Sequence, residues 1–453
     1  MGHMLRILAL LLAITPALRA QQQQATAHIG YIYPAGGRQG TTLQVKVGGQ
    51  FLDGVTNAFV SGAGVRAAVI EFVKPLTMQQ ANALREKMQE LQQKRLRGGR
   101  GGTNTFTAEE RLALEDIRKK LATFVRRPAT PAIAETAVVQ ITLATNAEPG
   151  EHELRLRTGL GLSNPLLFCV GQLPEYVKRE PVNNEQPRRG KKAGNNGEPE
   201  NTAPTEMTVT LPATLNGQIP PGGADRYHFQ ARKGQKLVAA MSARELIPYL
   251  ADAVPGWFQA NLTLYDAKGH ELSYDDRFRF HPDPVLAFEI PKDGEYVLEI
   301  HDSIYRGRED FVYRLNLGEL PFVTGIFPLG GKTGGETTVE LQGWNLPETS
   351  LTRRNGAPGI DSVSVRKGAF VSNRAPFAVD ALPECLEQEP NNSVATAQPV
   401  KLPIIVNGRI EKPGEWDVFR FDGRAGERVV TEVYARRLDS PLDSVLKLTD
   451  GAG

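Results

Sequence analysis

The chain has 453 residues, which is too many for one hydrophobic core, so several domains are expected. Its 45 Gly and 31 Pro residues, against 7% aromatic residues, indicate many short strands joined by turns and exclude a mainly helical protein. The net charge of +2 gives no global sign of nucleic-acid binding.

The first twenty residues have the pattern of a secretory signal peptide. Arg6 precedes a short apolar run, and the small residue Ala20 stands before the polar Gln21. This run is too short to span a bilayer, and no later stretch is long enough. The sequence therefore predicts a signal peptide at 1–20, no transmembrane segment, and an exported protein that is periplasmic, cell-surface or extracellular.

Two cysteines follow the signal peptide. Cys169 lies in a predicted strand at 166–170, and Cys385 lies in a predicted linker. A disulfide scaffold would carry more cysteines, so we expect two unpaired, partly buried thiols. A bridge between the linker and the strand is the alternative.

A Gly-rich stretch at 32–52 has a gapless counterpart at 326–346. Both copies contain Pro, a Gly-Gly pair, a further Gly and a final Gly-x-x-Leu, and both then alternate apolar and polar residues. Period-two alternation predicts a strand with one buried face behind a turn. The pattern resembles the opening of the immunoglobulin-like IPT/TIG domains, which implies β-sandwiches at 28–172 and 319–380.

Helical periodicity interrupts the first of these sandwiches. Apolar residues recur at three- and four-residue spacing in two segments: Ala81, Leu84, Met88 and Leu91, then Leu114, Ile117, Leu121 and Phe124. A capping box at 107–110 precedes the second segment. We therefore predict a helical hairpin insert at 75–127 with a Gly-rich tip at 97–102.

The predicted hairpin is strongly basic. Residues 74–127 contain 13 Lys or Arg and six Asp or Glu residues, a net charge of +7. One interpretation is an electrostatic contact with an acidic polysaccharide, phospholipid head groups or nucleic acid. The other is a solvated insertion, which we favour because no aromatic residues interleave the basic ones.

A second pattern is also repeated. The segment 211–219 matches 402–410, and each copy continues into an Asp-x-aromatic-x-Phe strand that begins at Asp225 or Asp417. The first copy adds a late Asp-Asp pair and Asp-Gly-x-Tyr. This succession resembles the bacterial pre-peptidase C-terminal (PPC) domain. The resemblance implies jelly-roll-like sandwiches on a secreted protein, often beside a peptidase and not themselves catalytic.

The stretch that precedes each of these units is shared as well. Residues 163–181 and 372–392 have Ser, Asn, Phe, Val, Leu-Pro-Glu and Glu-Pro in register. We therefore place linkers at 173–205 and 381–392, and PPC-like sandwiches at 206–318 and 393–453. Gly453 is the counterpart of Gly269, so we expect the second copy to be truncated and the natural protein to continue. The predicted fold class is all-β, with tandem immunoglobulin-like and jelly-roll-like sandwiches and a small inserted helical hairpin.

The second linker presents four oxygen donors within six residues: Glu387, Glu389, Asn391 and Asn392. Asp417 begins the strand that this linker would approach, and hard cations prefer several oxygen ligands. Clostridial collagen-binding domains resemble PPC domains and bind calcium with a Glu-x-Glu-x-Asn-Asp linker. The resemblance implies a calcium site on these five residues, although Gly414 stands where that family has a further Asp. The alternative is a simple turn at a domain start.

A weaker calcium site is possible by analogy in the first copy. Its predicted ligands are Glu198, Glu200 and Asn201 in the first linker, together with Asp225. The counterpart of Glu387 in this alignment is Asn196.

Two other loops invite functional interpretations. Tyr249, Trp257 and Phe258 could form a stacking surface for a sugar or a peptide, or they could cap the end of a sandwich, which we favour. The Asp275-Asp276 pair near His281 suggests metal or acid–base chemistry, but no partner His or Ser can be placed at catalytic spacing. We therefore interpret it as a turn.

The sequence contains no motif typical of nucleophilic or zinc-dependent catalysis. The sequence has no Gly-x-Ser-x-Gly, no His-Glu-x-x-His and no Cys/His arrangement. We therefore expect an exported, non-catalytic binding or scaffold protein of the cell surface or extracellular matrix, with polysaccharide or protein as partner and no specific nucleic acid. The alternative is a substrate-targeting region of a secreted peptidase or other hydrolase whose catalytic domain lies beyond residue 453. A purely structural envelope component is a third possibility.

Overall fold

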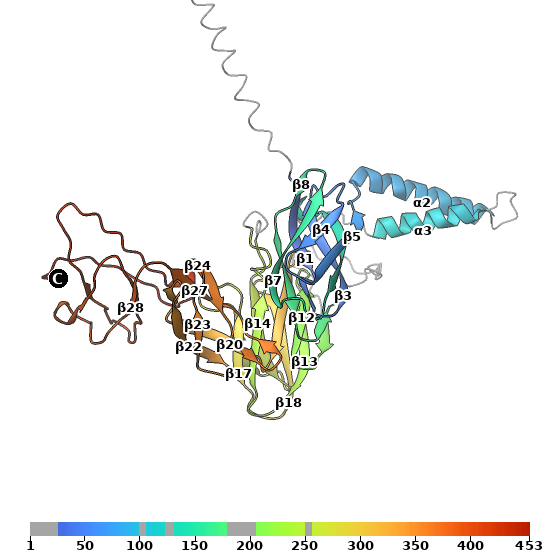
Figure 1. Ribbon diagram of the computed structural model, residues 1–453. Helices are drawn as coiled ribbons and strands as arrows, with labels where there is room; N and C mark the ends of the chain where they lie inside the picture. The colour runs from blue at the N-terminus through green and yellow to red at the C-terminus, as the bar shows by residue number, and fades with distance from the viewer. Residues whose placement is uncertain (1–25, 99–105, 123–130, 179–204, 250–255) are drawn as a thin grey trace, which may run out of the picture. The chain divides into compact units, whose positions relative to one another are not determined.

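The computed structural model describes residues 26–98, 106–122, 131–178, 205–249 and 256–453 (Figure 1). The chain forms two compact units. The first contains residues 26–170 with 247–249, and the second contains 171–178, 205–246 and 256–453. Both consist mainly of strands arranged in sandwiches, so the predicted all-β class is confirmed. The predicted signal peptide at 1–20 lies outside the described residues.

Sandwich 1 belongs to the first unit. Its sheets have the strand orders β1-β3-β6-β5 and β2-β9-β7-β4, with β8 paired to β7. The strands are β1 His28–Tyr33, β2 Gly36–Arg38, β3 Thr42–Gln50, β4 Asn57–Val60, β5 Val65–Val73, β6 Glu135–Leu143, β7 Gly150–Thr158, β8 Gly161–Leu162 and β9 Leu166–Gly171. The predicted alternation is confirmed on β3, where Val45 and Val47 are buried and Gln44 is exposed. The side chains of Val45 and Val47 pack with Ile141 and Phe168 in one apolar core.

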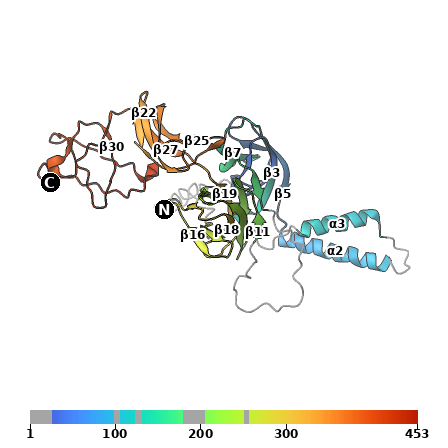
Figure 2. The ribbon, with the colours of Figure 1, turned by 90° about the horizontal axis from the view of Figure 1, so that it is seen from below.

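The predicted helical hairpin is inserted between β5 and β6. It consists of α2 (Met78–Gly98) and α3 (Ala108–Ala122), which lie side by side in Figures 1 and 2. The expected apolar positions Ala81, Leu114 and Ile117 are buried. The capping box is present, because the Glu110 N–H donates to Thr107 Oγ1 (3.2 Å) and the Thr107 N–H donates to the Glu110 carboxylate (3.0 Å). Residues 99–105, which include most of the predicted tip, lie outside the described part, as does Phe124.

Sandwich 2 belongs to the second unit and has two five-stranded sheets, β10-β12-β19-β14-β17 and β11-β13-β18-β15-β16. The strands are β10 Glu175–Val177, β11 Thr205–Thr208, β12 Ala213–Gln218, β13 Ala224–Ala231, β14 Lys236–Ser242, β15 Ala260–Asp266, β16 Glu271–Asp275, β17 Val285–Glu289, β18 Gly294–Asp302 and β19 Val312–Gly318. Inward-facing residues of both sheets, such as Leu215, Phe229, Leu264 and Leu315, form its core.

Sandwich 3 has the sheets β20-β22-β23 and β21-β27-β24, with a small ribbon β25-β26. The strands are β20 Phe322–Phe327, β21 Gly330–Lys332, β22 Glu336–Trp344, β23 Ser350–Arg354, β24 Gly359–Val363, β25 Arg366–Lys367, β26 Phe370–Val371 and β27 Ala375–Asp380. The pairing of β20 with β22 repeats that of β1 with β3, including a bulge at the same place: Val323 faces Gly343 as Ile29 faces Gly49. The sequence repeat is therefore a structural repeat.

Two short parallel pairs mark the C-terminal segment, β28 (Glu384–Leu386) with β30 (Ile405–Asn407) and β29 (Gln398–Pro399) with β31 (Phe419–Arg420). They repeat the pairs β10 with β12 and β11 with β13, since Glu384 faces Ile405 as Glu175 faces Thr214. Two 3₁₀ turns, Val394–Thr396 and Arg436–Leu438, complete the segment. We call residues 175–229 the first repeat and residues 384–421 the second repeat.

The structure differs from the predicted linkers at these pairs. The strands β10 and β28 lie inside the segments 173–205 and 381–392, where no regular structure is expected from the sequence. The reason is that each strand is only three residues long, which is too short to show a period in the sequence. The cysteines lie on β9 (Cys169) and β28 (Cys385), and both side chains are half-buried. No described helix combines the length and hydrophobicity needed to cross a bilayer.

The Asn of the repeated Ser-Asn pair makes the same hydrogen bonds in both copies. The Asn164 side chain accepts from the Ile29 N–H (2.7 Å) and donates to the Ile29 carbonyl (2.8 Å). Asn373 makes the same two bonds to Val323, at 2.7 and 2.9 Å. In each sandwich, the amide thereby satisfies the backbone of the residue at which the ladder bulges.

We expect Asn164→Ala to lower the free energy of unfolding of sandwich 1 by about 1–3 kcal/mol, because it leaves the buried Ile29 N–H and carbonyl without their partner. Urea denaturation of the full chain, followed by hydrogen exchange of β1 and β3, measures the loss. Asn57→Ala, at an exposed position of β4, is the matched control. Equal stability of the two variants would contradict the assigned role.

Candidate metal centre

The candidate site begins where β28 ends. The Glu387 N–H donates to the Asn407 carbonyl (3.0 Å), which continues the parallel ladder by one residue. One Glu387 carboxylate oxygen, Oε1, accepts the Arg409 N–H at 2.5 Å. Gly408 leaves room for this side chain, since a Cβ there would lie 2.6 Å from Glu387 Oε2. The backbone therefore fixes the direction of the Glu387 carboxylate.

The Glu-Pro-Asn-Asn turn brings the next donors to the same place. The Asn391 N–H donates to a Glu389 carboxylate oxygen (3.0 Å), and the Asn391 carbonyl accepts from the Val418 N–H (2.8 Å). Val418 directly follows Asp417. The first bond closes the turn within the linker, and the second holds the linker against the start of the Asp-x-Phe-x-Phe strand.

Three carboxylates converge as a result. One oxygen from each of Glu387, Glu389 and Asp417 lies within 4.8 Å of the other two, and no other described group of His, Cys, Asp or Glu residues gathers in this way. We call these residues the acidic triad. Glu387 and Asp417 are half-buried, and Glu389 is exposed. The triad could hold a metal ion.

Four buried polar atoms, two in the triad and two in Asn391, have no hydrogen-bond partner in the described part of the protein. They are Glu387 Oε2, Asp417 Oδ1, and both Oδ1 and Nδ2 of Asn391, whose side chain is 0% exposed. A buried amide without a hydrogen bond costs about 1–3 kcal/mol, so such groups ordinarily face a ligand or water. The Asn391 amide, two residues after Glu389, is therefore available to a ligand or to water.

The charge of the triad is not balanced by a neighbouring base. Burial raises the pKa of Glu387 from its usual 4.5 to about 7, and the neighbouring carboxylates Asp417 and Glu389 add to the rise. The hydrogen bond from the Arg409 N–H acts in the opposite direction and lowers this pKa. Burial also raises the pKa of Asp417, and Glu389, Glu415 and Glu411 add to the rise. The guanidinium of Arg409 packs on the Phe327 ring (3.7 Å to its centre) and pairs with Glu340 instead.

The raised pKa has a consequence for stability. Because Glu387 binds its proton more tightly in the folded chain than in the unfolded chain, its ionisation opposes folding. This cost is absent below the usual pKa of 4.5, grows between about pH 4.5 and pH 7, and is constant at higher pH. A bound cation would remove the cost by favouring the ionised form.

The predicted ligand set is thus only partly assembled. Glu387, Glu389 and Asp417 lie together, and the buried Asn391 is bonded through its backbone carbonyl to Val418, beside Asp417. The Asn392 amide, by contrast, donates toward Glu415 (3.4 Å). Sequence reasoning missed the exposed Glu411 and the half-buried Glu415, two carboxylates that raise the pKa of Asp417. Their closeness to Gly414, the position of the missing Asp, was the available signal.

The weaker predicted site has a different character. Glu198, Glu200 and Asn201 lie outside the described residues. The Asp225 carboxylate lies 2.5 Å from the Lys178 ammonium, and both side chains are buried, at 1% and 7% exposure. The Tyr313 hydroxyl donates to the other oxygen of Asp225 at 2.6 Å. Asp225 therefore belongs to an internal ion pair.

The three aromatic residues predicted to form a stacking surface do not have a common environment. Phe258 is 4% exposed and stacks on Phe311 in the core of sandwich 2, so it offers no outer face. The Tyr249 hydroxyl donates to the Pro165 carbonyl (2.9 Å), and its ring packs on the core of sandwich 1. Trp257 is 43% exposed. Phe258 therefore cannot belong to a stacking surface for a sugar or a peptide, which was the less favoured of the two interpretations.

The Asp275-Asp276 segment forms a turn, as interpreted from the sequence. An Asp275 carboxylate oxygen accepts the Arg277 N–H (2.9 Å), and Phe278 and His281 form an isolated bridge. Asp283, which follows, is buried and accepts the N–H groups of Ala243, Arg244 and Glu245. These carboxylates hold backbone in place.

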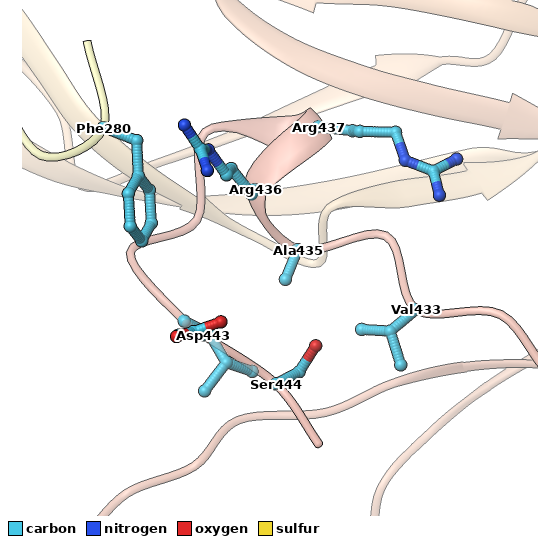
Figure 3. A pocket seen from close by; sticks show the side chains of 8 residues that line it. Phe280, Val433, Ala435, Arg436, Arg437, Asp443 and Ser444 are labelled. Atoms are coloured by element: carbon cyan, nitrogen blue, oxygen red, sulfur yellow. The ribbon is translucent and has the colours of Figure 1, made fainter. Parts of the chain in front are cut away.

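A small cavity lies beside this turn (Figure 3). It is lined by Phe280, Val433, Ala435, Arg436, Arg437, Leu442, Asp443 and Ser444. The Arg436 guanidinium lies 4.6 Å from the Phe280 ring centre. The cavity volume of about 180 Å³ is below the roughly 300–1,000 Å³ of typical small-molecule pockets, so it is a poor candidate for a ligand site.

No protein-family model and no curated protein sequence matches the chain. Among solved structures, it is similar to the pre-peptidase C-terminal domain of collagenase from Bacillus anthracis, at 15% identity and a TM-score of 0.20, over 26% of this chain and 99% of that chain. The periplasmic lysozyme inhibitor PliG from Aeromonas hydrophila is 16% identical with a TM-score of 0.18, over 26% of this chain and 98% of that chain.

A third similarity is to SGBP-B from a xyloglucan utilization locus of Bacteroides uniformis. It has 10% identity and a TM-score of 0.18, over 65% of this chain and 73% of that chain. Folds of this kind host many unrelated activities, so these similarities give no function to the chain.

Proposed function

We propose that the chain is an exported, non-catalytic binding protein of the cell surface or extracellular matrix, with polysaccharide or protein as partner. We further propose that its second repeat binds one calcium ion. The acidic triad carries the second proposal, together with the buried Asn391 amide that has no protein partner.

Glu387, Glu389, Asp417 and the Asn391 amide oxygen would hold the ion. All four are oxygen donors, which suits a hard cation, and the absence of His and Cys from the set disfavours zinc and copper. The exposed Glu389 leaves room for water in the coordination shell. Calcium accepts such an irregular shell, whereas magnesium requires a near-octahedral one.

The bound ion would supply positive charge that the protein lacks at this position. Two of the three carboxylates come from the linker, and the third comes from the start of the strand at Asp417. The chain therefore positions the ion as a cross-link between the linker and the sheet. Calcium would then order the segment 384–392 without changing the sandwiches before it.

We expect one calcium ion to bind to the full chain with a dissociation constant of about 10⁻⁴–10⁻³ M, the range of extracellular modules. Isothermal titration calorimetry with calcium measures this value, and magnesium is the comparison. Hydrogen exchange should slow at 384–392 and 405–420 when calcium is added and should not change in β3 or β6. Unchanged exchange at millimolar calcium, or protection equally strong with magnesium, would refute the calcium site.

Calcium binding should also depend on pH. Only an ionised carboxylate can bind the ion, and the pKa of Glu387 is about 7 in the metal-free protein. Protons therefore compete increasingly below pH 7, and we expect affinity about tenfold weaker at pH 6 than at pH 8. Calorimetric titrations at the two pH values test this, and Glu387→Gln should remove most of the pH dependence along with much of the affinity. A dissociation constant that is the same at pH 6 and pH 8 would contradict the assignment.

A further inference from the structure

The two repeats place different residues at one structurally equivalent position. Lys178 follows β10 as Glu387 follows β28, and each donates its N–H to the paired strand: to the Asn216 carbonyl (2.9 Å) and to the Asn407 carbonyl (3.0 Å). Asp225 and Asp417 are the matching carboxylates opposite them. The backbone pairing at this position is therefore the same in both repeats, and the side chain that it positions differs in charge.

In the first repeat this position holds a positive charge. The Lys178 ammonium lies 2.5 Å from Asp225 Oδ1 and donates to the Gln218 carbonyl at 3.2 Å. The Tyr313 hydroxyl donates to the other carboxylate oxygen, Asp225 Oδ2, at 2.6 Å. It is also hydrogen-bonded to the Tyr227 hydroxyl at 2.7 Å. Both oxygens of Asp225 thus have a donor inside the protein.

In the second repeat the same position is negative. Glu387 faces Asp417, and its Oε1 accepts the N–H of Arg409, the residue equivalent to Gln218. The lysine of the first repeat thus reaches the carbonyl of this residue, whereas the glutamate of the second repeat reaches its N–H. The polarity at the centre of the site is reversed.

We infer that the Lys178 ammonium does in the first repeat what a bound cation does in the second, so that the first repeat needs no metal. The inference rests on the proposed calcium site for its second half. Its consequence is that the calcium response of the chain is confined to the segment around 384–392. A chelator would loosen this segment and leave the equivalent segment around 175–178 ordered.

The cost of leaving the Asp225 carboxylate buried without a partner explains the need for the Lys178 ammonium. A buried carboxylate that loses its cationic partner strongly destabilises the fold, so we expect Asp225 to need either Lys178 or a substitute ion. Because the ammonium is tethered to the chain, its local concentration does not depend on the medium. The second repeat, by contrast, depends on the calcium concentration around it.

The reciprocal exchange of the two residues tests the inference in the full chain. Glu387→Lys should lose calcium binding and show, without calcium, the slow hydrogen exchange at 384–392 that the wild type shows only with calcium. Lys178→Glu should exchange at least tenfold faster at 175–178 and 224–229 without calcium. It should then recover with calcium and bind a second ion in calorimetry.

Lys178→Met is the control that separates loss of charge from gain of a site. It should speed exchange at 224–229 as Lys178→Glu does, but calcium should not restore it. The inference is overturned if Lys178→Met leaves exchange at 224–229 unchanged, or if Glu387→Lys still responds to calcium. If the wild type itself does not bind calcium, the proposed function fails, while the Lys178→Met result still decides whether Lys178 is required in the first repeat.

Discussion

Replacing Arg314 by methionine is expected to lower the free energy of unfolding of sandwich 2 by about 3–5 kcal/mol. Its guanidinium binds the Glu175 carboxylate through two bonds, of 2.9 and 2.7 Å, and donates to Asn216 Oδ1 at 3.1 Å. The Arg314 side chain is buried, at 4% exposure, and the Glu175 side chain is 11% exposed. Without Arg314, Glu175 keeps only the Asn216 amide, at 2.9 Å, as a described side-chain partner.

Urea denaturation of the full chain, followed by hydrogen exchange of β12 and β19, measures this loss. The double variant Arg314→Met with Glu175→Leu should recover most of the stability, because removing both charges leaves no unpaired ion in the core. Glu384→Gln is the matched control. Glu384, the equivalent of Glu175, is bonded to the Asn407 amide at 3.2 Å, and burial raises its pKa. A single variant within 1 kcal/mol of the wild type would show that the pair contributes little.

Asp417→Asn is expected to weaken calcium binding by about 100-fold or more. It removes one of three carboxylates from the acidic triad while keeping the shape of the side chain. The same substitution should slow hydrogen exchange at 384–392 in the absence of calcium. The reason is that it removes one of two neighbouring carboxylates that burial and mutual repulsion make costly to ionise.

The two opposite effects distinguish a metal ligand from a merely structural aspartate. Isothermal titration calorimetry measures the first effect, and hydrogen exchange in EGTA measures the second. Glu411→Gln makes the same change of charge outside the triad and should weaken binding by less than about tenfold, since Glu411 acts on the site only through its field. An Asp417→Asn variant that binds calcium as the wild type does, or that exchanges faster in EGTA, would contradict the assigned role.

The candidate ligands could be found from the sequence because most of them are close in the chain. Glu387, Glu389 and Asn391 are neighbours on an extended segment, and the family resemblance supplied Asp417. The sequence could not show that the Asn392 side chain points away from the other candidate ligands. It donates toward Glu415, which lies 23 residues further along the chain. The sequence also could not predict side-chain exposure: Trp257 and Phe258 are adjacent, yet Trp257 is exposed and Phe258 is buried.

The amino-acid sequence by itself determined the strand-rich class, the helical insert with its capping box, and the two repeats. These features depend on local periodicity and turn residues, which are written in consecutive positions. Only the tertiary structure decided that Lys178 faces Asp225, that Arg314 reaches Glu175, and that Asn164 holds Ile29. The physical reason is that each contact joins residues far apart in the chain, and its partner is set by the register between paired strands.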